Sequence, residues 1–563
     1  MAENKTQDQR QTPAASEPGH TRASKRPTWL RLSHEHTTFS AMLLLMVSTL
    51  LSRVIGLVRS KVIAYLFGAG TLTDAYNAAF QLPEMMNYFL VGGAASITFI
   101  TILSRYREQH REHEGEEALS VILSVMLIVL GSAVILGELF APFYTRIFFP
   151  GFDAQKAALC THMTRILLPA QLCFFSGGVL AAVLLVRKQF AWQAVTPLIY
   201  NLGIIFGGVL LARQFGISSL AVGALGGAIV GPLLLNYLGA HNVGLRLRFS
   251  LNWSHPGFRE WVRLSIPLMI GVSLVTADNW ILNYFASHGS GDIAKLSYAK
   301  TLFTAPMAVL GQAAGAASMP FFAALAGQNK HREFASSVNR IVTRIYAFAF
   351  LLSAWMIGLA YPAVDLVLRG GAFHHADARQ TALYFTLFAG SLCFWSAQAI
   401  YARAFYAAGN TLTPMTASTL ITVASIPLYW LLFHHMGVVG LAIASDCGIL
   451  VQTLALAWLL QRKRLVPWSG LEYSELARSL AAGIVSFAAL FGVLHVLPPP
   501  GSFPRDLLQL ACGTAVWLAI AWLVLYLTRS SLPQQLIGRF RGRSATNVPT
   551  AALESETPQI SNI

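Results

Sequence analysis

Apolar residues run along this chain in long stretches that are separated by short polar segments. A membrane-spanning helix needs about 20 mostly apolar residues, whereas the strands of a membrane barrel alternate apolar and polar side chains over about 10 residues. The stretches here have the first pattern, which predicts an all-α integral membrane protein. We expect about fourteen transmembrane helices, at residues 38–58, 75–101, 118–146, 160–186, 192–213, 217–238, 262–286, 294–325, 341–368, 378–407, 412–435, 438–460, 475–497 and 506–528.

Two stretches of the pattern occur twice. The segment "RKQFAWQAVTPLIYNLGII" (187–205) is similar to "AAGNTLTPMTASTLITVAS" (407–425), and "GISSLAVGALGGAIVGPLLLNY" (216–237) is similar to "GVVGLAIASDCGILVQTLALAW" (437–458). Many transporters are built from duplicated halves with the substrate site between them. We therefore predict two six-helix lobes and an additional C-terminal helix pair. The expected parts are a disordered tail (1–37), an N-lobe (38–240), a linker (241–261), a C-lobe (262–460), the helix pair (461–529) and a second disordered tail (530–563).

Composition supports the membrane class, because 55% of the 563 residues are apolar and only 12% are charged. Lysine and arginine favour the cytoplasmic side of short loops. Of the 40 basic residues, 28 fall on the side of the two termini, nine fall on the other side, and Arg53, Arg165 and Lys300 lie within predicted helices. Both termini are therefore predicted to be cytoplasmic. This bias accounts for most of the net charge of +15, so we expect no nucleic-acid partner.

Motifs for common enzyme chemistry are absent from the sequence. The five cysteines are dispersed over predicted helices and form no CxxC pair, which argues against a metal site or a disulfide framework. The chain has no GxxxxGK[ST] phosphate loop, so we do not expect it to hydrolyse ATP. The sequence therefore predicts a protein that is not an enzyme and carries no organic cofactor or metal.

Ionisable residues in or beside the predicted helices are the candidate functional residues. Such a residue near the middle of a membrane costs about 2.5 to 3.5 kcal/mol unless it meets water, a partner or a ligand. Arg53 and Arg59 come from the N-lobe and Lys300 comes from the C-lobe. Together they predict a positive chamber that binds an anionic substrate. Two other interpretations stay open, namely that Arg59 and Lys61 reach the lipid headgroups and that Arg53 is neutralised by Asp74.

Three segments resemble one known family. The stretch "SRVIGLVRSKVIAYLFGAGTLTDAYNAAFQLP" (52–83) resembles the start of the MurJ (MviN) family of lipid II flippases, within the multidrug/oligosaccharidyl-lipid/polysaccharide exporter superfamily. The stretch "VLRGGAFHHADARQTALYFTLFAGSLCFWSAQAIYARAFYAAGNTLTP" (367–414) is similar to the family's RGAF and ARAFYA segments. The stretch "GVVGLAIASDCG" (437–448) is similar to the start of its twelfth helix. The resemblance covers residues 40 to 530 approximately.

This resemblance implies a multi-pass protein of the bacterial inner membrane that takes part in cell-wall (peptidoglycan) biosynthesis and maintenance of cell shape. It would move the undecaprenyl-pyrophosphate-linked precursor, lipid II, from the cytoplasmic to the periplasmic leaflet by alternating access. The implied partners are this lipid-linked precursor, membrane lipids and cell-wall synthesis proteins. Carried over by position, the substrate-binding residues are Ser52, Arg53, Arg59, Asp74 and Lys300, with Lys300 standing where the family usually has arginine.

The chain departs from the family at several charged positions. The family commonly has an acid after the second helix-one arginine, two arginines in helix two and a Glu-Gly step, where this chain has Ser60, Asn87 with Tyr88, and Gly92. Such changes leave a second function open, namely the transport of another polyprenyl-linked glycan. A third is a scaffold for envelope synthesis that does not transport.

The energy source of transport is also open. Asp278 with Asn279 is a candidate site for a coupling sodium ion, and protons or the membrane potential are the alternatives. A drug/cation antiporter of the same superfamily would place acids in its cavity, and Asp278 and Asp446 are the candidates for that role.

Overall fold

A computed structural model of the protein describes residues 38–91, 99, 102–270 and 274–534, and all its named secondary-structure elements are helices. Nine helices in this described part are long and apolar enough to cross a membrane. The bent pair His375–Gly390 and Leu392–Ala407 makes a tenth candidate. These features confirm the all-α membrane fold, while the count of fourteen spans stays a prediction.

The helices before the linker form the first half of the molecule. Their bounds are α1 Thr38–Phe67, α2 Thr71–Ala79, α3 Gln81–Met86, the π-helix η2 Asn87–Val91, α5 Glu112–Phe148, α6 Ala154–Leu167, α7 Ala170–Val186, α8 Phe190–Phe215, α9 Ser218–Ala228, the π-helix η3 Ile229–Leu235 and α10 Asn236–Asn242. The predicted end of the first helix at residue 58 was wrong, because α1 continues to Phe67. Arg59 and Lys61 interrupt the apolar run without ending the helix, and the apolar stretch "VIAYLF" follows them within α1.

Of the remaining helices, α11 packs against α5 and η2 of the first half, and the others form the second half. Their bounds are α11 Pro256–Ile270, α12 Leu274–Ala286, α13 Asp292–Met307, the π-helix η4 Ala308–Ala313, α14 Ala314–Gly327, α15 His331–Gly358, α16 Ala360–Leu368, α17 His375–Gly390, α18 Leu392–Ala407, α19 Leu412–Arg462, the 3₁₀ turn η5 Trp468–Gly470, α20 Tyr473–Val496 and α21 Phe503–Leu527. Several predicted helices are thus split into shorter pieces. Proline lies inside α13 and α14, and it removes a backbone donor from a helix and favours such breaks.

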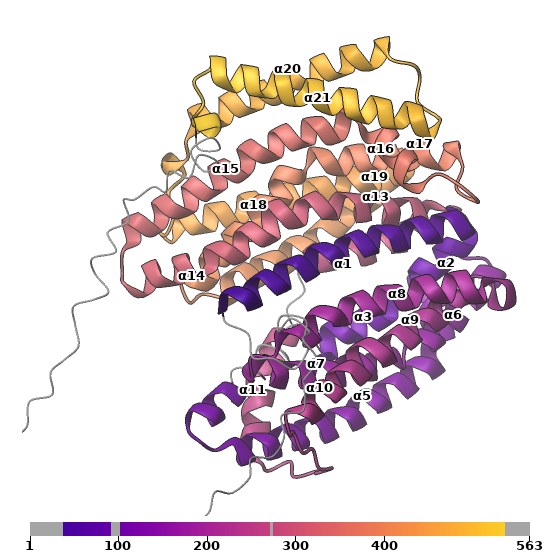
Figure 1. Cartoon of the computed structure of the whole chain (residues 1–563), viewed down its shortest axis with the longest axis vertical. Coiled ribbons are helices and arrows are strands. Elements are labelled where there is room, and N and C mark those ends of the chain that lie inside the picture. The colour runs from indigo at the N-terminus through magenta and orange to yellow at the C-terminus, as the bar shows by residue number, and fades with distance from the viewer. Residues whose placement is uncertain (1–37, 92–98, 100–101, 271–273, 535–563) are drawn as a thin grey trace, which may run out of the picture.

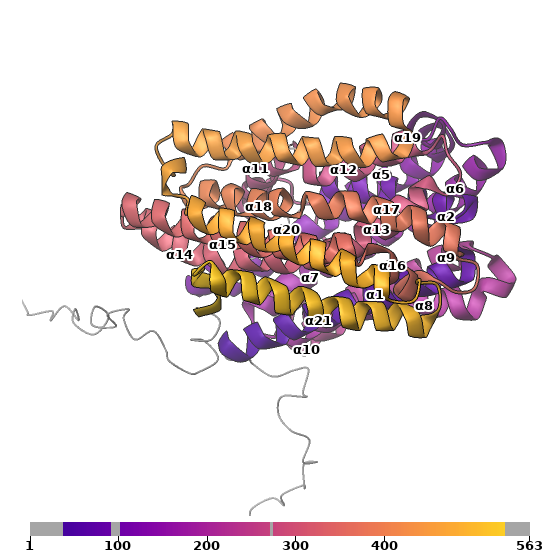
Figure 2. The same cartoon turned by 90° about the horizontal axis from the view of Figure 1, so that it is seen from above.

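The long helices run roughly parallel or antiparallel to one another in both views (Figure 1, Figure 2). Helices α2 to α11 gather at the bottom of Figure 1, and α12 to α19 lie above them, with α1 between the two groups. α20 and α21 pack on the outer side of α15 and α16. This arrangement places α1 where it contacts both α8 and α13.

The two ends of the bundle differ in charge. We call the left end of Figure 1 the basic end, because the arginine-rich loops at residues 105–111, 187–189, 246–248 and 462–464 lie there. The opposite end, called the far end, carries the loops at residues 68–70, 149–153, 287–291, 369–374 and 497–502.

The predicted tails lie mostly outside the described residues, as all of 1–37 and 535–563 do. Residues 530–534 are described and pack against the helix pair. The hydroxyl of Ser530 donates to Glu475 of α20, and Leu532 is buried.

Two turns support the predicted internal repeat. α19 has 51 residues, and a straight helix of that length would measure about 77 Å, more than twice the thickness of a membrane core of about 30 Å. It is broken at Gly437, where φ is 60° and ψ is −139°. Gly216, between α8 and α9, has nearly the same angles of 54° and −139°. Only glycine adopts such a conformation readily, so the two related sequences form the same turn.

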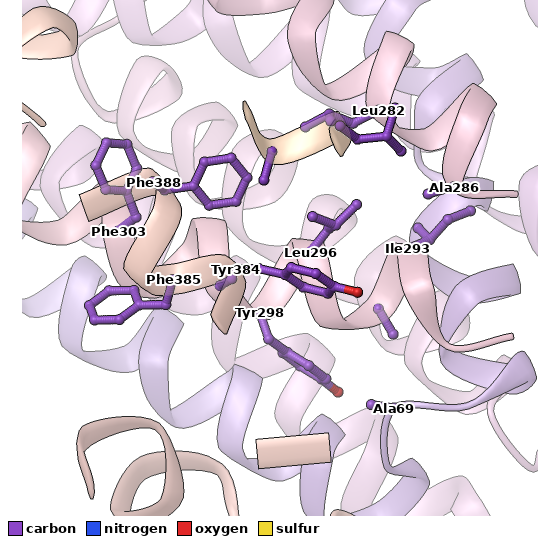
Figure 3. Packing of buried hydrophobic residues seen from close by; sticks show 14 of the residues in the cluster. Ala69, Leu282, Ala286, Ile293, Leu296, Tyr298, Phe303, Tyr384, Phe385 and Phe388 are labelled. Atoms are coloured by element: carbon purple, nitrogen blue, oxygen red, sulfur yellow. The ribbon is translucent and has the colours of Figure 1, made fainter. Parts of the chain in front are cut away.

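The largest hydrophobic cluster extends across both halves near the far end. It combines Ile63 and Ala69 of the first half with Ile293, Tyr298 and Phe303 of α13. Figure 3 shows part of this cluster, with Tyr298 pointing toward Ala69, which lies just after α1. The Tyr298 hydroxyl donates to the carbonyl of Gly68 at 3.1 Å. The two halves are therefore packed together at this end.

Candidate functional site

A cavity of about 500 Å³ lies between the two halves of the molecule. α1, α2, α3 and α8 line it on one side, and α12, α13, η4 and α18 line it on the other. Of the predicted substrate-binding residues, Arg59 and Lys300 face this cavity from opposite sides. The polar residues of its lining are Arg59, Ser60, Tyr76, Asn77, Glu84, Tyr200, Asn279, Asn283, Ser297, Tyr298, Lys300, Thr301, Thr304, Gln312 and Trp395.

Arg59 is the cation in this lining whose hydrogen-bonding capacity is least used. It lies on α1 and is partly buried, and its Nε is buried without a hydrogen-bond partner. A buried donor on a charged group costs more than about 1 to 3 kcal/mol when it is left unpaired. Arg59 can therefore bind an anionic ligand that offers it an acceptor oxygen.

Lys300, in contrast, is bound to protein acceptors. Its Nζ donates to Asn279 Oδ1 at 2.8 Å and forms an ion pair with Asp278, whose side chain is fully buried. The hydroxyl of Tyr429 donates to the same carboxylate. Phe388 lies with its ring centroid 5.5 Å from the Lys300 ammonium, within the range of a cation–π contact. Lys300 is thus the counter-ion of a buried acid as well as a cavity residue.

The same contacts bear on the predicted coupling-ion site. Oxygens of Asp278 and Asn279 both accept hydrogen bonds from the Lys300 ammonium. A sodium ion bound to these two residues would have to compete with that ammonium. In the conformation described here, the cation bound to Asp278 and Asn279 is the Lys300 ammonium.

Arg53 and Ser52 also lie on α1, and they are nearer to the basic end than Arg59 is. Arg53 is exposed, and its guanidinium donates to Gln312 Oε1 at 3.3 Å. Gln312 belongs to η4 and lines the cavity, so Arg53 bridges the two halves at the edge of the cavity. Ser52 is partly buried and is not among the lining residues.

Asp74 lies elsewhere, in a joint between the two halves at the far end. Its carboxylate pairs with Lys156 Nζ at 2.8 Å and accepts from the backbone N–H groups of Gly291 at 2.7 Å and Ala294 at 2.8 Å. These amides belong to the start of α13, where the helix dipole stabilises an anion. The structure thus places Asp74 outside the cavity lining and in a structural contact. The suggested pairing of Arg53 with Asp74 was wrong, because Lys156 holds this position.

A second joint at the far end is made by residues 369–373, in the loop between α16 and α17. The Ala372 N–H donates to the Tyr65 carbonyl of α1 at 2.9 Å. Gly371 has a φ of +57°, and a Cβ on it would lie 2.1 Å from the Tyr65 oxygen. The Lys61 ammonium donates to the Arg369 carbonyl, so Lys61 is bound to this loop. Both joints hold the two halves together at the far end.

Sequence reasoning missed Glu84, whose side chain is exposed and lines the same cavity as Arg59. It also missed Lys156, the partner of Asp74. An acid inside the predicted helix at 75–101 was itself a signal for a functional residue. Lys156 gave no such signal, because it follows a loop and resembles a surface residue in the sequence.

The residues that depart from the family pattern lie in different parts of the molecule. Ser60 is buried in the cavity wall, and its hydroxyl donates to the Gly56 carbonyl at 3.1 Å. Asn87 and Tyr88 begin η2, and the Tyr88 ring packs edge-on against Trp280. Gly92 lies outside the described residues.

The chain is similar to known proteins over most of its length. The family model described as "Lipid II flippase MurJ" matches residues 63–502. A probable lipid II flippase MurJ of Buchnera aphidicola subsp. Acyrthosiphon pisum is 26% identical over 478 residues, which cover 83% of this chain and 93% of that protein. A protein of the same name from Synechocystis sp. is 24% identical over 461 residues, which cover 79% of this chain and 85% of the relative.

Solved structures show the same fold. The structure titled "Lipid II flippase MurJ, inward closed conformation" has a TM-score of 0.71 at 21% identity, covering 86% of this chain and 99% of that chain. An inward-facing multidrug resistance MATE family transporter of the MOP superfamily has a TM-score of 0.59 at 14% identity, covering 75% of this chain and 98% of that one. Because the family match extends over more than half of the sequence, this chain belongs to the lipid II flippase MurJ family.

Proposed function

We propose that this protein is a lipid II flippase, which moves the undecaprenyl-pyrophosphate-linked peptidoglycan precursor between the leaflets of the bacterial inner membrane. Membership of the MurJ family supports this function. The observation that carries it is the position of Arg59 in a cavity between two halves of the molecule, with a buried donor that has no partner.

A pyrophosphate is a suitable ligand for this arginine. The guanidinium is planar and remains charged, and it can bind two phosphate oxygens at once. Lys300 offers a second positive charge on the opposite wall, although its ion pair with Asp278 partly neutralises that charge. Arg53 lies at the edge of the cavity, where its bond to Gln312 is long at 3.3 Å and can be exchanged for a phosphate contact.

In an alternating-access cycle, the two joints at the far end would keep the protein closed on that side. They consist of the Asp74 contacts with α13 and of the contacts between residues 369–373 and α1. Release of the substrate on that side requires both joints to separate. A few hydrogen bonds and ion pairs make such an interface breakable, since each contributes only a modest net free energy.

The basic end is proposed to face the cytoplasm, with both termini on that side. The distribution of 28 basic residues against nine supports this orientation. The conformation described here is then closed toward the periplasm. Cell-wall synthesis proteins remain predicted partners.

The membrane potential is the proposed driving force. A pyrophosphate headgroup is anionic, and moving one negative charge from a negative interior to the outside gains about 2.3 kcal/mol per 100 mV. Lys300 already occupies the oxygens of Asp278 and Asn279 as a tethered cation, so no sodium ion is assigned to them.

Transport of another polyprenyl-linked glycan is the second candidate function. The altered positions Ser60, Asn87 and Tyr88 favour it, because they change the charges that the family usually has near this cavity. A scaffold without transport would have no need for Arg59 and Lys300 in a cavity. A drug/cation antiporter is less favoured, since neither of its candidate acids, Asp278 and Asp446, lines the cavity, and the acid that does, Glu84, shares the lining with the cations Arg59 and Lys300.

Complementation of a flippase-depleted bacterial strain tests the proposal. The wild-type protein should restore growth fully, and Arg59→Lys should restore it partly. Arg59→Ala should fail to restore growth although it is expressed normally. Full growth with Arg59→Ala would remove the substrate-binding role of this residue. If the wild type itself fails while it is present in the membrane, transport of another glycan becomes the better function.

A further inference from the structure

A cluster of charged side chains lies at the far end, where α16, α17 and α21 come together (Figure 1). Asp365 of α16 and Asp506 of α21 have fully buried side chains, and both lie beside Arg369. The Arg369 Nε is 3.2 Å from Asp365 Oδ2, and the Arg369 Nη2 donates to Asp506 Oδ2 at 3.5 Å. Two buried acids therefore share one arginine.

The two acids differ in their hydrogen bonds. Asp506 accepts from the Gly501 N–H at 2.9 Å and from Arg369. Among the described residues, no donor makes a hydrogen bond to either oxygen of Asp365, although both are buried, and the Arg369 Nε is not aligned for one. A buried ionised carboxylate is costly unless it is paired and hydrogen-bonded. Asp506 thus has the surroundings of an ionised acid, and Asp365 has those of a protonated one.

His375 of α17 does not supply a second positive charge in this arrangement. Its Nε2 is 3.1 Å from the Arg369 Nη1, and an arginine N–H can only donate, so this nitrogen accepts and the imidazole is neutral. Its Nδ1 lies 3.5 Å from Asp365 Oδ1 and 3.2 Å from the Tyr361 hydroxyl. The His375 side chain is 51% exposed, so it links Asp365 to water at the far end.

The other charged and titratable groups near Asp365 do not neutralise it directly. They come from α16 itself and from helices that pack against it, and they are Lys61 of α1, Tyr361 of α16 and Arg379 of α17. Among the described residues, Lys61 forms no ion pair within 4.0 Å, and its ammonium donates to the Arg369 carbonyl. Two carboxylates that share a site in this way disfavour ionisation of both at once.

Arg369 connects this cluster to the joint with α1. Its carbonyl accepts from the Lys61 ammonium of α1, and its guanidinium donates to the Gly501 carbonyl in the loop before α21. With a proton on Asp365, the charges of Arg369 and Asp506 balance. Loss of that proton would leave a second buried carboxylate without compensation, which favours separation of the surrounding elements and their hydration.

We propose that the Asp365 carboxylate takes up a proton from water when the far end closes and returns it to the same side when the far end opens. A state that binds an additional proton is favoured as the pH falls. Acidic conditions should therefore hold the far end closed, and alkaline conditions should open it. The proton site does not depend on which lipid is transported.

Distances between spin labels on the purified full-length protein test this site. Labelled cysteines at Gln214, near the far end of α8, and at Ser290, before α13, report the separation of the two halves in a cysteine-free background. Between about pH 5 and about pH 8, the ratio of separated to closed molecules should rise about tenfold or more in this labelled parent. Asp365→Asn imitates the protonated acid and should stay closed throughout. Asp377→Asn is the matched control on α17, where the acid accepts from the His374 N–H, and it should respond like the parent.

Three results would overturn the proton site. The first is a ratio that does not change with pH in the labelled parent. The second is a pH response that persists in Asp365→Asn. Should that variant melt early, Asp506→Asn takes its place, because Asp365 then pairs with Arg369 alone and needs no proton. A pH response as large as that of the parent in Asp506→Asn is the third.

Discussion

Lys300 shows how a single residue in this cavity has two roles. Its side chain is 16% exposed to the cavity, while that of its partner Asp278 is 0% exposed. Removing one member of a buried ion pair leaves the other charge without compensation. The stability of the C-lobe is therefore linked to a residue that also faces the substrate.

We predict that Lys300→Gln lowers the thermal stability of the purified protein markedly. The expected loss is about 3 to 5 kcal/mol, because Asp278 would stay buried without its cation. Lys300→Arg should keep most of the stability, and the double variant Lys300→Gln/Asp278→Asn should recover a large part of it. The measurement is the Tm of each variant in detergent. An unchanged Tm for Lys300→Gln, together with lost substrate binding, would show that Lys300 acts as a phosphate clamp and not as a counter-ion.

Single residues could be predicted from the sequence when their chemistry conflicted with their surroundings. Arg59 and Lys300 stood out as cations in apolar stretches, and both line the cavity. Asp74 stood out equally, yet it caps the start of α13. The difference depends on which residues are neighbours in space, and nothing near Asp74 in the sequence indicates Gly291 or Lys156.

At the scale of helices, the joint at Asp74 connects α2 and α6 with the first turn of α13. Lys156 and Asp74 are 6% and 0% exposed, so the pair is shielded from water. Its strength decides how easily the far end separates.

A double-mutant cycle measures this joint. Asp74→Asn and Lys156→Met should each lower the Tm, since each leaves a buried charge without its partner. The double variant should lose clearly less stability than the sum of the two, because the residues are in direct contact and their effects are not independent. Additive losses would show that the two groups do not interact across the joint.

Whole elements were predicted better than their ends. The similarity between the repeated sequences correctly predicted that the turns at Gly216 and Gly437 are related. Each turn has a glycine that is followed by the same apolar pattern. The end of α1 and the break at η4 were not predicted. Hydropathy reports where lipid or protein surrounds a helix, but hydrogen bonding decides where a helix stops, and α1 continues through Arg59 and Lys61 toward the loop at 369–373.

On the scale of the whole molecule, we predict that the basic end faces the cytoplasm and the far end faces the periplasm. We expect single cysteines in a cysteine-free background to be labelled from the cytoplasm at His113 and Ser469 and from the periplasm at Ser290. All three positions are exposed and lie in or beside loops of the basic end or the far end. Labelling of His113→Cys by a probe that cannot cross the membrane, added outside intact cells, would reverse the proposed topology.

The central claim is that lipid II crosses the membrane through the cavity that Arg59 lines. The most direct measurement is the rate at which lipid II moves between leaflets in vesicles that contain the purified protein. The wild type should accelerate this movement over empty vesicles, and Arg59→Ala should lose about tenfold or more of the acceleration, since it removes charge-assisted hydrogen bonds to the phosphates. Arg165→Ala is the matched control, because Arg165 is exposed and donates to the Glu138 carbonyl away from the cavity, and it should transport normally. Wild-type vesicles that behave like empty ones, or an Arg59→Ala variant as fast as the wild type, would contradict the claim.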